Sequence, residues 1–141
     1  MGAMSLDGIL VSPLARIAAT GGGVLHAIKR TDAGFAGFGE AYFSSVSQGA
    51  IKAWKLHTRM TMNIIVPVGQ VRFAFHLRDT NEFRVEELGA DRYARVTVPP
   101  GIWFGFQGLA AHNLLLNIAN IPHDPAEVQR LAISEIKFGW S

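Results

Sequence analysis

Lys55 and His57 stand one residue apart in a short alternating stretch, residues 53–57. A histidine side chain transfers protons near neutral pH, and a lysine side chain carries a positive charge. The two-residue period of a β-strand puts Ala53, Lys55 and His57 on one face, with Trp54 and Leu56 on the other. A polar face in an otherwise apolar sheet is either the solvent side or the lining of a cavity, and the function depends on which it is.

The elements that must position this pair are strands. After residues 53–57 come a β-branched run at residues 63–66, a turn at Pro67-Val68-Gly69 and a second alternating run at residues 71–77. Three successive strands, two of them joined by a tight turn, predict an antiparallel meander.

Further strand-like stretches recur along the chain, with turn residues between them. They are residues 9–11, 14–17, 24–28, 40–46, 83–88, 95–98, 102–106, 112–119 and 133–140. The only helix-like segment is residues 124–131, where Asp124 is a suitable cap and Pro125 a suitable first-turn residue. This pattern predicts an all-β fold, an antiparallel β-barrel or double-stranded jelly roll with one short C-terminal helix.

The composition limits the class of protein. A chain of 141 residues suits one domain, residues 1–141, and 49% hydrophobic with 17% charged residues describes a globular protein with a large core. The 13 basic and 11 acidic residues form no basic stripe that would hold a nucleic acid. No apolar run approaches the ~20 residues of a membrane span, and no signal-peptide pattern is present, so the expected location is the cytoplasm. Because there is no cysteine, disulfides, zinc–thiolate sites and thiol nucleophiles are excluded.

Two spaced motifs resemble those of the cupin barrels. The first cupin motif has two histidines one residue apart, then a glutamate, then six residues and a glycine; the corresponding residues here are Lys55, His57, Met62 and Gly69. The second motif has Pro-any-Gly, two residues and a histidine, matched by Pro99-Pro100-Gly101-Ile102-Trp103-Phe104. The four metal-ligand places therefore hold Lys, His, Met and Phe, and one histidine cannot supply the donors that a divalent ion needs. We expect no metal and no other cofactor.

Nearly the whole chain is similar to one metal-free cupin family, the dTDP-4-dehydrorhamnose 3,5-epimerases. That family has Arg-Gly-Leu-His before a strand pair, a glycine turn, Asp-Leu-Arg after it, and then Pro-Pro-Gly-any-any-His-Gly-Phe. The counterparts here are Trp54-Lys55-Leu56-His57, the Gly69 turn, His76-Leu77-Arg78 and, over residues 99–106, Pro-Pro-Gly-Ile-Trp-Phe-Gly-Phe.

The resemblance implies a reaction. The family epimerises a carbon beside a ketone, which needs a base, a cation or donor that holds the enolate, and an acid on the opposite face of the sugar. The family's base corresponds to His57. Its lysine falls on Met62, so Lys55 is the candidate cation. Its tyrosine is absent from Leu115-Leu116-Asn117, so Tyr42 is the candidate acid.

The resemblance also implies a carboxylate that pairs with the base and comes from late in the chain. Asp124 and Glu135 are the late acids considered for this role.

Candidates for substrate binding are chosen by side-chain type. Aromatic rings can stack on a base or sugar, arginines can hold a diphosphate, and amide or imidazole groups can orient sugar hydroxyls. The candidates are Trp54, Trp103 and Phe104, then Arg59, Arg72 and Arg78, then His76 and Asn117. Packing in the core is the alternative for the aromatics, and a solvated strand face is the alternative for the arginines. If His76 faces inward, it lies across from His57.

The leading hypothesis is an epimerase or isomerase that acts on a dTDP- or GDP-linked 4-keto-6-deoxy sugar, with His57 as the base. The related sugar 3,4-ketoisomerases use a His-any-His pair, of which only His57 is present. The alternative is a sugar-binding or structural cupin that has lost the acid and the enolate clamp. An acidic group bonded to the His57 ring in an open cavity would favour catalysis, whereas a His57 sealed by Met62 and Phe104 would favour the alternative. The expected partners are the nucleotide sugar and, as in the family, a second copy of the chain in a homodimer.

Overall fold

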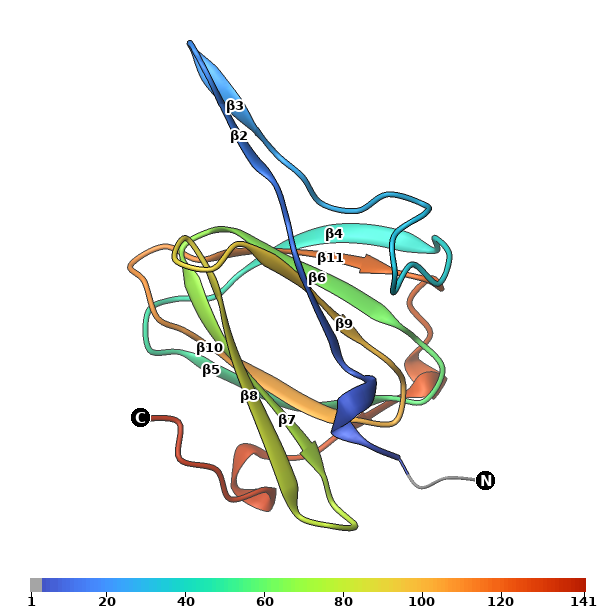
Figure 1. Ribbon diagram of the computed structural model, residues 1–141. Coiled ribbons are helices and arrows are strands. Elements are labelled where there is room, and N and C mark those ends of the chain that lie inside the picture. The colour runs from blue at the N-terminus through green and yellow to red at the C-terminus, as the bar shows by residue number, and fades with distance from the viewer. Residues whose placement is uncertain (1–3) are drawn as a thin grey trace.

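The computed structural model describes residues 4–141, so residues 1–3 of the predicted domain lie outside the described part. Two five-stranded antiparallel sheets face each other (Figure 1). The first sheet contains, in spatial order, β1 (Leu10–Pro13), β9 (Ala94–Val98), β6 (Met62–Val68), β11 (Leu114–Ala119) and β4 (Glu40–Ser45). The second contains β12 (Val128–Arg130), β5 (Ile51–His57), β10 (Trp103–Gly108), β7 (Gln70–Leu77) and β8 (Glu82–Gly89). The predicted all-β jelly roll is confirmed.

The hydrophobic core lies between the two sheets, because alternate residues of each strand point inward. Along β7, Val71, Phe73 and Phe75 are completely buried in this core, whereas Ala74 belongs to a separate cluster on the outer face. Burying one such large side chain contributes about 1.5–3 kcal/mol, so the inward residues hold the sheets together.

The strands on either side of Gly69 belong to different sheets. The predicted tight turn is present: Gly69 has a φ of +89°, and a side chain there would collide with the carbonyl oxygen of His112. The predicted meander is wrong, because β6 pairs with β9 and β11, while β5 and β7 both pair with β10. β6 is buried on both faces, between the second sheet and the loop before β4, where Asn63 donates to the Gly34 carbonyl. A strand enclosed in this way lies at the centre of its own sheet.

A bulge interrupts β5. Its pairing with β10 shifts between Phe104 and Gly105, which lie opposite Lys55 and Ala53, so that Trp54 is an extra residue without a partner on β10. A bulge of this kind turns two successive side chains toward the same side of the sheet.

The bulge decides which β5 side chains face the interior. The side chains of Ala53 and Trp54 both pack in the cluster on the outer face, although both residues border the cavity, and Lys52, Lys55 and His57 line the interior. The prediction that Ala53 shares a face with Lys55 and His57 is therefore wrong, because it assumed an uninterrupted alternation.

The predicted C-terminal helix is only one turn long. Asp124 accepts a hydrogen bond from the Ala126 N–H, and Pro125 opens the turn, as predicted. The turn, η2 (Pro125–Glu127), is a 3-10 turn that ends at Val128, where β12 begins. Pairing with the free edge of β5 replaces the helical hydrogen bonds that residues 128–130 would otherwise make.

The alternating stretch at residues 133–140 is not a strand. After η3 (Ile133–Glu135) the chain is irregular, and Ile136, Phe138 and Trp140 pack against Trp54 and other aromatic residues on the outer face of the second sheet. Its alternating apolar residues cover a sheet rather than extend one. At the N-terminal end, the described chain begins with the 3-10 turn η1 (Leu6–Gly8).

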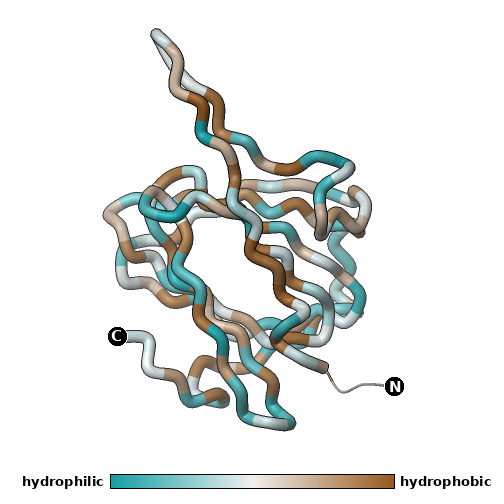
Figure 2. Tube along the Cα trace, in the orientation of Figure 1, coloured by the Kyte–Doolittle hydropathy of each residue, from teal (hydrophilic) through white to brown (hydrophobic). Residues whose placement is uncertain are grey.

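One hairpin projects from the barrel. It consists of β2 (Arg16–Ala19) and β3 (Gly22–Leu25), which pair with each other and form a separate two-stranded sheet (Figure 1). Ile17, Val24 and Leu25 each expose about half of their surface (50%, 51% and 48%), and Figure 2 shows hydrophobic segments along this hairpin. In residues 4–141 we find no helix with the length and apolar character that a membrane span needs.

Candidate active site

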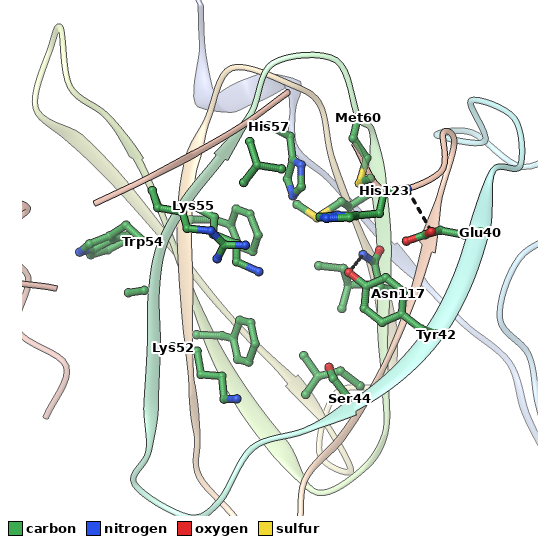
Figure 3. Close-up of a pocket in the computed structure, with 18 of the residues that line it drawn as sticks. Glu40, Tyr42, Ser44, Lys52, Trp54, Lys55, His57, Met60, Asn117 and His123 are labelled. Carbon is green, nitrogen blue, oxygen red and sulfur yellow. Dashed lines mark hydrogen bonds between the residues drawn. The ribbon is translucent and has the colours of Figure 1, made fainter. Parts of the chain in front are cut away.

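A cavity of about 630 Å³ lies between the two sheets, flanked by their edge strands β4 and β12 (Figure 3). Its apolar lining includes Met60, Met62, Ile64, Phe104, Phe106 and Leu115. Lys55, His57, Met62 and Phe104, which fill the four ligand places of the cupin motifs, all line it. The polar face of β5 is therefore the lining of a cavity.

His57 pairs with a buried carboxylate. Its ring Nδ1 lies 2.5 Å from Glu127 Oε1, and the two side chains expose only 10% and 1% of their surface. Because a carboxylate accepts hydrogen bonds, Nδ1 carries the proton of this contact, and Nε2 is the nitrogen that can accept a further proton. The His57 ring also stacks on Phe104, with 6.0 Å between centroids. These contacts fix the orientation of the His57 ring. A histidine that acts as a general base needs a neighbouring group that orients it in this way.

Backbone groups next to His57 hold the Glu127 carboxylate. Its Oε2 accepts hydrogen bonds from the N–H groups of Arg59 and Met60, at 3.1 and 3.2 Å. The Glu127 carbonyl accepts from the N–H and the hydroxyl of Thr58. Burial raises the pKa of the carboxyl group, but the hydrogen bonds from His57 and the two amides outweigh it and hold the pKa of Glu127 below its ordinary value. The carboxylate is therefore ionised at neutral pH.

Sequence reasoning missed Glu127. Of the two acids considered for this role, Asp124 caps η2 and Glu135 lies exposed in η3. Glu127 is 70 positions from His57, and no local pattern marks it. Its side chain reaches His57 because the chain leaves η2 directly into β12, which pairs with β5.

Three cations form one wall of the cavity. Lys52 and Lys55 come from β5 (Figure 3). Arg130 from β12 lies directly opposite Lys55 in the strand pairing and also lines the cavity. Within residues 4–141, no carboxylate lies at ion-pair distance from any of the three. Burial and then the positive charges of Arg130 and Lys52 lower the pKa of Lys55. Sequence reasoning missed both Lys52 and Arg130. Lys52 faces the cavity because of the bulge in β5, and Arg130 lies on β12, where a helix was predicted.

The opposite wall carries Tyr42 and Asn117. Tyr42 on β4 and Asn117 on β11 are direct partners in the ladder, and Asn117 Nδ2 donates a hydrogen bond of 2.9 Å to the Tyr42 hydroxyl oxygen. The Tyr42 hydroxyl proton is therefore available to a ligand. Asn117 Oδ1 is buried and has no partner among the described residues. Figure 3 shows this pair on the side of the cavity that faces the lysines.

His123 lies on the connection between β11 and η2. Its backbone N–H donates to Glu40 Oε1 at 3.0 Å, which fastens this connection to β4, and its ring points into the cavity in Figure 3. No motif marks His123 in the sequence. The cavity therefore has imidazole groups from two separate elements.

Two of the predicted aromatic rings point away from the cavity: Trp54 borders it but turns its ring outward in Figure 3, and Trp103 does not line it. Trp54 and Trp103 pack together on the outer face of the second sheet, under the C-terminal segment, and Trp54 Nε1 donates to the Ile133 carbonyl at 3.3 Å. Phe104 faces inward because it is the next residue along β10 after Trp103. Of the three aromatics, the structure brings only the Phe104 side chain to His57; the two indole rings are part of the outer cluster.

His76 also faces outward, so it does not lie across from His57. Its ring stacks on Phe83, with 4.1 Å between centroids, and its Nδ1 lies 2.9 Å from the Glu82 carbonyl oxygen. Burial lowers the pKa of His76, and the bond to the carbonyl partly offsets this effect. His76 follows Phe75, which points into the core, and successive residues of a strand point to opposite faces, so the His76 side chain points outward.

The three candidate arginines lie away from the cavity. Arg59 is exposed and pairs with Asp124 Oδ2 at 2.6 Å. Arg72 pairs with Glu87 Oε2 at 2.8 Å and donates to the Trp140 carbonyl, so it holds the C-terminal segment on the outer face. Arg78 is exposed beyond the end of β7. The structure therefore does not bring these arginines to the cavity.

No group of three or more metal-ligating side chains gathers anywhere in residues 4–141. Because Lys55, Met62 and Phe104 fill the ligand places of the cupin motifs, we expect the purified protein to hold no stoichiometric metal and a chelator to leave its thermal stability unchanged. Elemental analysis of the purified protein is the measurement, and about one metal ion per chain would contradict the prediction.

Comparisons with known proteins identify the class. The chain matches no protein-family model and no curated protein sequence. Among solved structures it is similar to a dTDP sugar isomerase from Desulfovibrio desulfuricans, with 34% identity, a TM-score of 0.88, and 95% of this chain and 91% of that chain covered. It also shares its fold with a sugar 3,4-ketoisomerase from Thermoanaerobacterium thermosaccharolyticum in complex with TDP, at 18% identity and a TM-score of 0.78 over 94% of this chain and 96% of that one.

A third solved structure is a 3′-monoepimerase from Streptomyces bikiniensis in complex with dTDP-quinovose, at 12% identity and a TM-score of 0.83, covering 99% of this chain and 78% of that one. Fold and site together define a cupin-type barrel of the sugar-nucleotide enzymes. Given the 34% identity across almost its full length, the chain belongs to the dTDP-sugar isomerase family.

Proposed function

We propose that this protein isomerises or epimerises a dTDP-linked 4-keto-6-deoxy sugar by removing the proton on the carbon next to the ketone. The observation that carries the proposal is the His57–Glu127 pair in the wall of the cavity, with 2.5 Å between Nδ1 and Oε1. A histidine oriented by an ionised carboxylate is suited to act as a general base at neutral pH. The names of the related solved proteins support the substrate class.

The residues around His57 supply the remaining requirements of the step. His57 Nε2 takes the proton, and the electron pair of the broken C–H bond moves into the enolate. Lys55, on the same face of β5, offers positive charge to the enolate oxygen, which is usually the largest single contribution to such a step. The Tyr42 hydroxyl on the opposite wall can donate a proton from the other face.

The cationic wall supports binding of a diphosphate. Lys52, Lys55 and Arg130 line the cavity, and no carboxylate among the described residues pairs with them, so an anionic ligand can neutralise them. This assignment replaces the arginines expected from the sequence.

Deuterium exchange tests the function. Wild-type protein incubated with dTDP-4-keto-6-deoxyglucose in deuterated water should incorporate deuterium at C3, measured by NMR or mass spectrometry. The sugar-binding or structural alternative predicts binding without incorporation. GDP-linked sugars serve as the comparison for the nucleotide. Binding of the sugar with no deuterium at any carbon would refute the catalytic proposal.

We further propose that residues 1–141 act as one cupin domain that pairs as a homodimer. The half-exposed Ile17, Val24 and Leu25 on the projecting hairpin support an interface there, because contiguous exposed apolar groups mark interaction sites. We expect light scattering to give twice the mass of one chain and the double variant Ile17→Lys with Val24→Lys to give the mass of one chain. The matched control Val85→Lys, at a 42% exposed position on β8, should stay dimeric. A wild-type protein with the mass of one chain would contradict the proposal.

The cytoplasmic location stays a prediction that cell fractionation would check.

A further inference from the structure

Lys55 is placed to share a small ligand with His57. The two residues are two positions apart on β5 and line the same cavity, and two steps along a strand span about 7 Å. Their side chains can therefore reach neighbouring atoms of one sugar ring from the same side.

Lys55 is also surrounded by positive charge. Arg130 lies directly opposite it in the β5–β12 pairing, where Cβ atoms are about 5 Å apart, and Lys52 reaches the same face through the bulge. The other titratable groups that line the cavity are His57 on β5, Glu40 and Tyr42 on β4, and His123 after β11. None of the carboxylates within residues 4–141 forms an ion pair with Lys55.

A lysine in these surroundings releases its proton more readily than an exposed lysine does. Half-burial disfavours the ammonium ion, and the neighbouring cations add to this effect, so the pKa of Lys55 is lowered. Arginine at the same position would keep its charge, because a guanidinium group stays protonated in proteins. The chain therefore combines, on one face of one strand, a base and a cation that can give up a proton.

We propose that Lys55 is a catalytic proton-transfer residue of a 3,4-ketoisomerisation, in which it moves a proton between the two sugar oxygens while His57 moves one between the two carbons. The proposal rests on the proposed function and selects isomerisation within it. Epimerisation requires an acid on the opposite face of the sugar, whereas isomerisation can run from one wall, because each proton moves only between neighbouring atoms.

The steps balance without a redox partner. His57 removes the C3 proton, the C–H electron pair forms the C3–C4 double bond, and the carbonyl π pair moves onto O4. The Lys55 ammonium protonates O4 and becomes an amine, which then removes the proton of the C3 hydroxyl group. The electron pair left on O3 forms the C3 carbonyl. The electron pair of the C3–C4 double bond takes the proton from His57, so that this proton ends on C4. Both side chains return to their starting states, and the product is the 3-keto, 4-hydroxy isomer.

Two substitutions at residue 55 separate a proton carrier from a fixed charge. Lys55→Arg keeps the cation, so deuterium exchange at C3 should persist within about tenfold of wild type. Formation of the 3-keto sugar, located by borodeuteride reduction of the product, should fall by about 100-fold or more, which is typical for loss of a general acid–base group. Lys55→Met should lose both activities. Lys137→Gln, an exposed lysine outside the cavity, is the control and should retain both.

The outcomes are distinguishable. If Lys55→Arg forms the 3-keto sugar within threefold of wild type, a fixed charge is sufficient and the role of Lys55 is refuted. If wild-type protein shows neither C3 exchange nor 3-keto product, the proposed function itself fails and this proposal fails with it. If wild-type protein incorporates deuterium at C3 but forms no 3-keto sugar, the proposed isomerisation is wrong, while the role of His57 as the base stands.

The pH dependence gives a second test that leaves Lys55 in place. The rate of 3-keto formation should fall at alkaline pH as the Lys55 ammonium loses its proton. Arg130→Gln removes a repelling charge, so this alkaline limb should move to higher pH, and Lys137→Gln should leave it unchanged. An alkaline limb that does not move in Arg130→Gln would overturn the proposal.

Discussion

Replacing His57 with asparagine should lower deuterium exchange at C3 of a dTDP-linked 4-keto-6-deoxy sugar by about 10³-fold or more, close to background. The expected effect follows from the loss of the imidazole Nε2 that takes the proton, since a positioned general base contributes roughly 10²–10⁴-fold. Asparagine keeps a polar group of similar size beside Glu127 and Phe104, so the fold and the binding of dTDP should persist.

The measurement is the initial rate of exchange by NMR, with dTDP binding by calorimetry as the check on folding. His112→Asn is the matched control, because this histidine is exposed and does not line the cavity. Exchange in His57→Asn at the rate of the wild type would show that another group is the base. His123, whose ring points into the same cavity, would be the next candidate.

Glu127→Gln should damage both stability and activity. The carboxylate accepts hydrogen bonds from His57 and from the N–H groups of Arg59 and Met60, and a glutamine amide has one oxygen and one NH₂ group in their place. One donor must lose its acceptor. Leaving a buried polar group without its partner costs roughly 1–3 kcal/mol, so the melting temperature should fall by about 5–10 °C. Exchange should fall by about 10–100-fold, because the His57 ring loses the partner that fixes its tautomer.

The pH dependence of stability separates this effect from simple loss of packing. The folded-state pKa of Glu127 lies below its ordinary value, so its contribution to the free energy of unfolding is fully present above the unfolded pKa. The contribution is lost as pH falls through the folded pKa. Urea titrations from neutral to acidic pH should therefore show a steeper loss of stability in the wild type than in Glu127→Gln. Glu135→Gln, an exposed glutamate in η3, should behave like the wild type. Parallel pH profiles for wild type and Glu127→Gln would refute the assignment.

The shared face of Lys55 and His57 and the fold class could be read from local sequence. Lys55 and His57 occupy alternate positions of one strand, and a period of two places them on one face however the rest of the chain folds. Repeated short strands with turns between them restrict the chain to an all-β architecture, and Gly69 marks a corner because only glycine fits its backbone there. These features depend on neighbours within a few residues.

The long-range arrangement could not be read in the same way. Glu127 meets His57 across 70 positions, and Arg130 meets Lys55 only because residues 128–130 pair with the free edge of β5. A propensity for a helical turn at Asp124-Pro125 was correct locally, but edge pairing ended the turn after three residues. Sequence separation of this size leaves no periodic signal.

Tertiary packing likewise decided which face of the sheet each aromatic ring lies on. Trp54, Trp103 and His76 have the chemistry of a binding site, yet the C-terminal segment covers them on the outer face, and Phe104 is the one that reaches His57. A sheet that is covered on both sides has apolar residues on both faces, so hydrophobicity alone cannot tell the two apart.

The sequence by itself therefore determined most of the strands, the Gly69 corner and the Lys55–His57 face, because backbone alternation and turn sterics are local. The tertiary structure alone decided that this face lines a cavity, that Glu127 holds the His57 ring and that Lys52 joins the cationic wall. The physical reason for the last is the bulge at Trp54, where two outward residues oppose one on β10 and the alternation of the strand is reset.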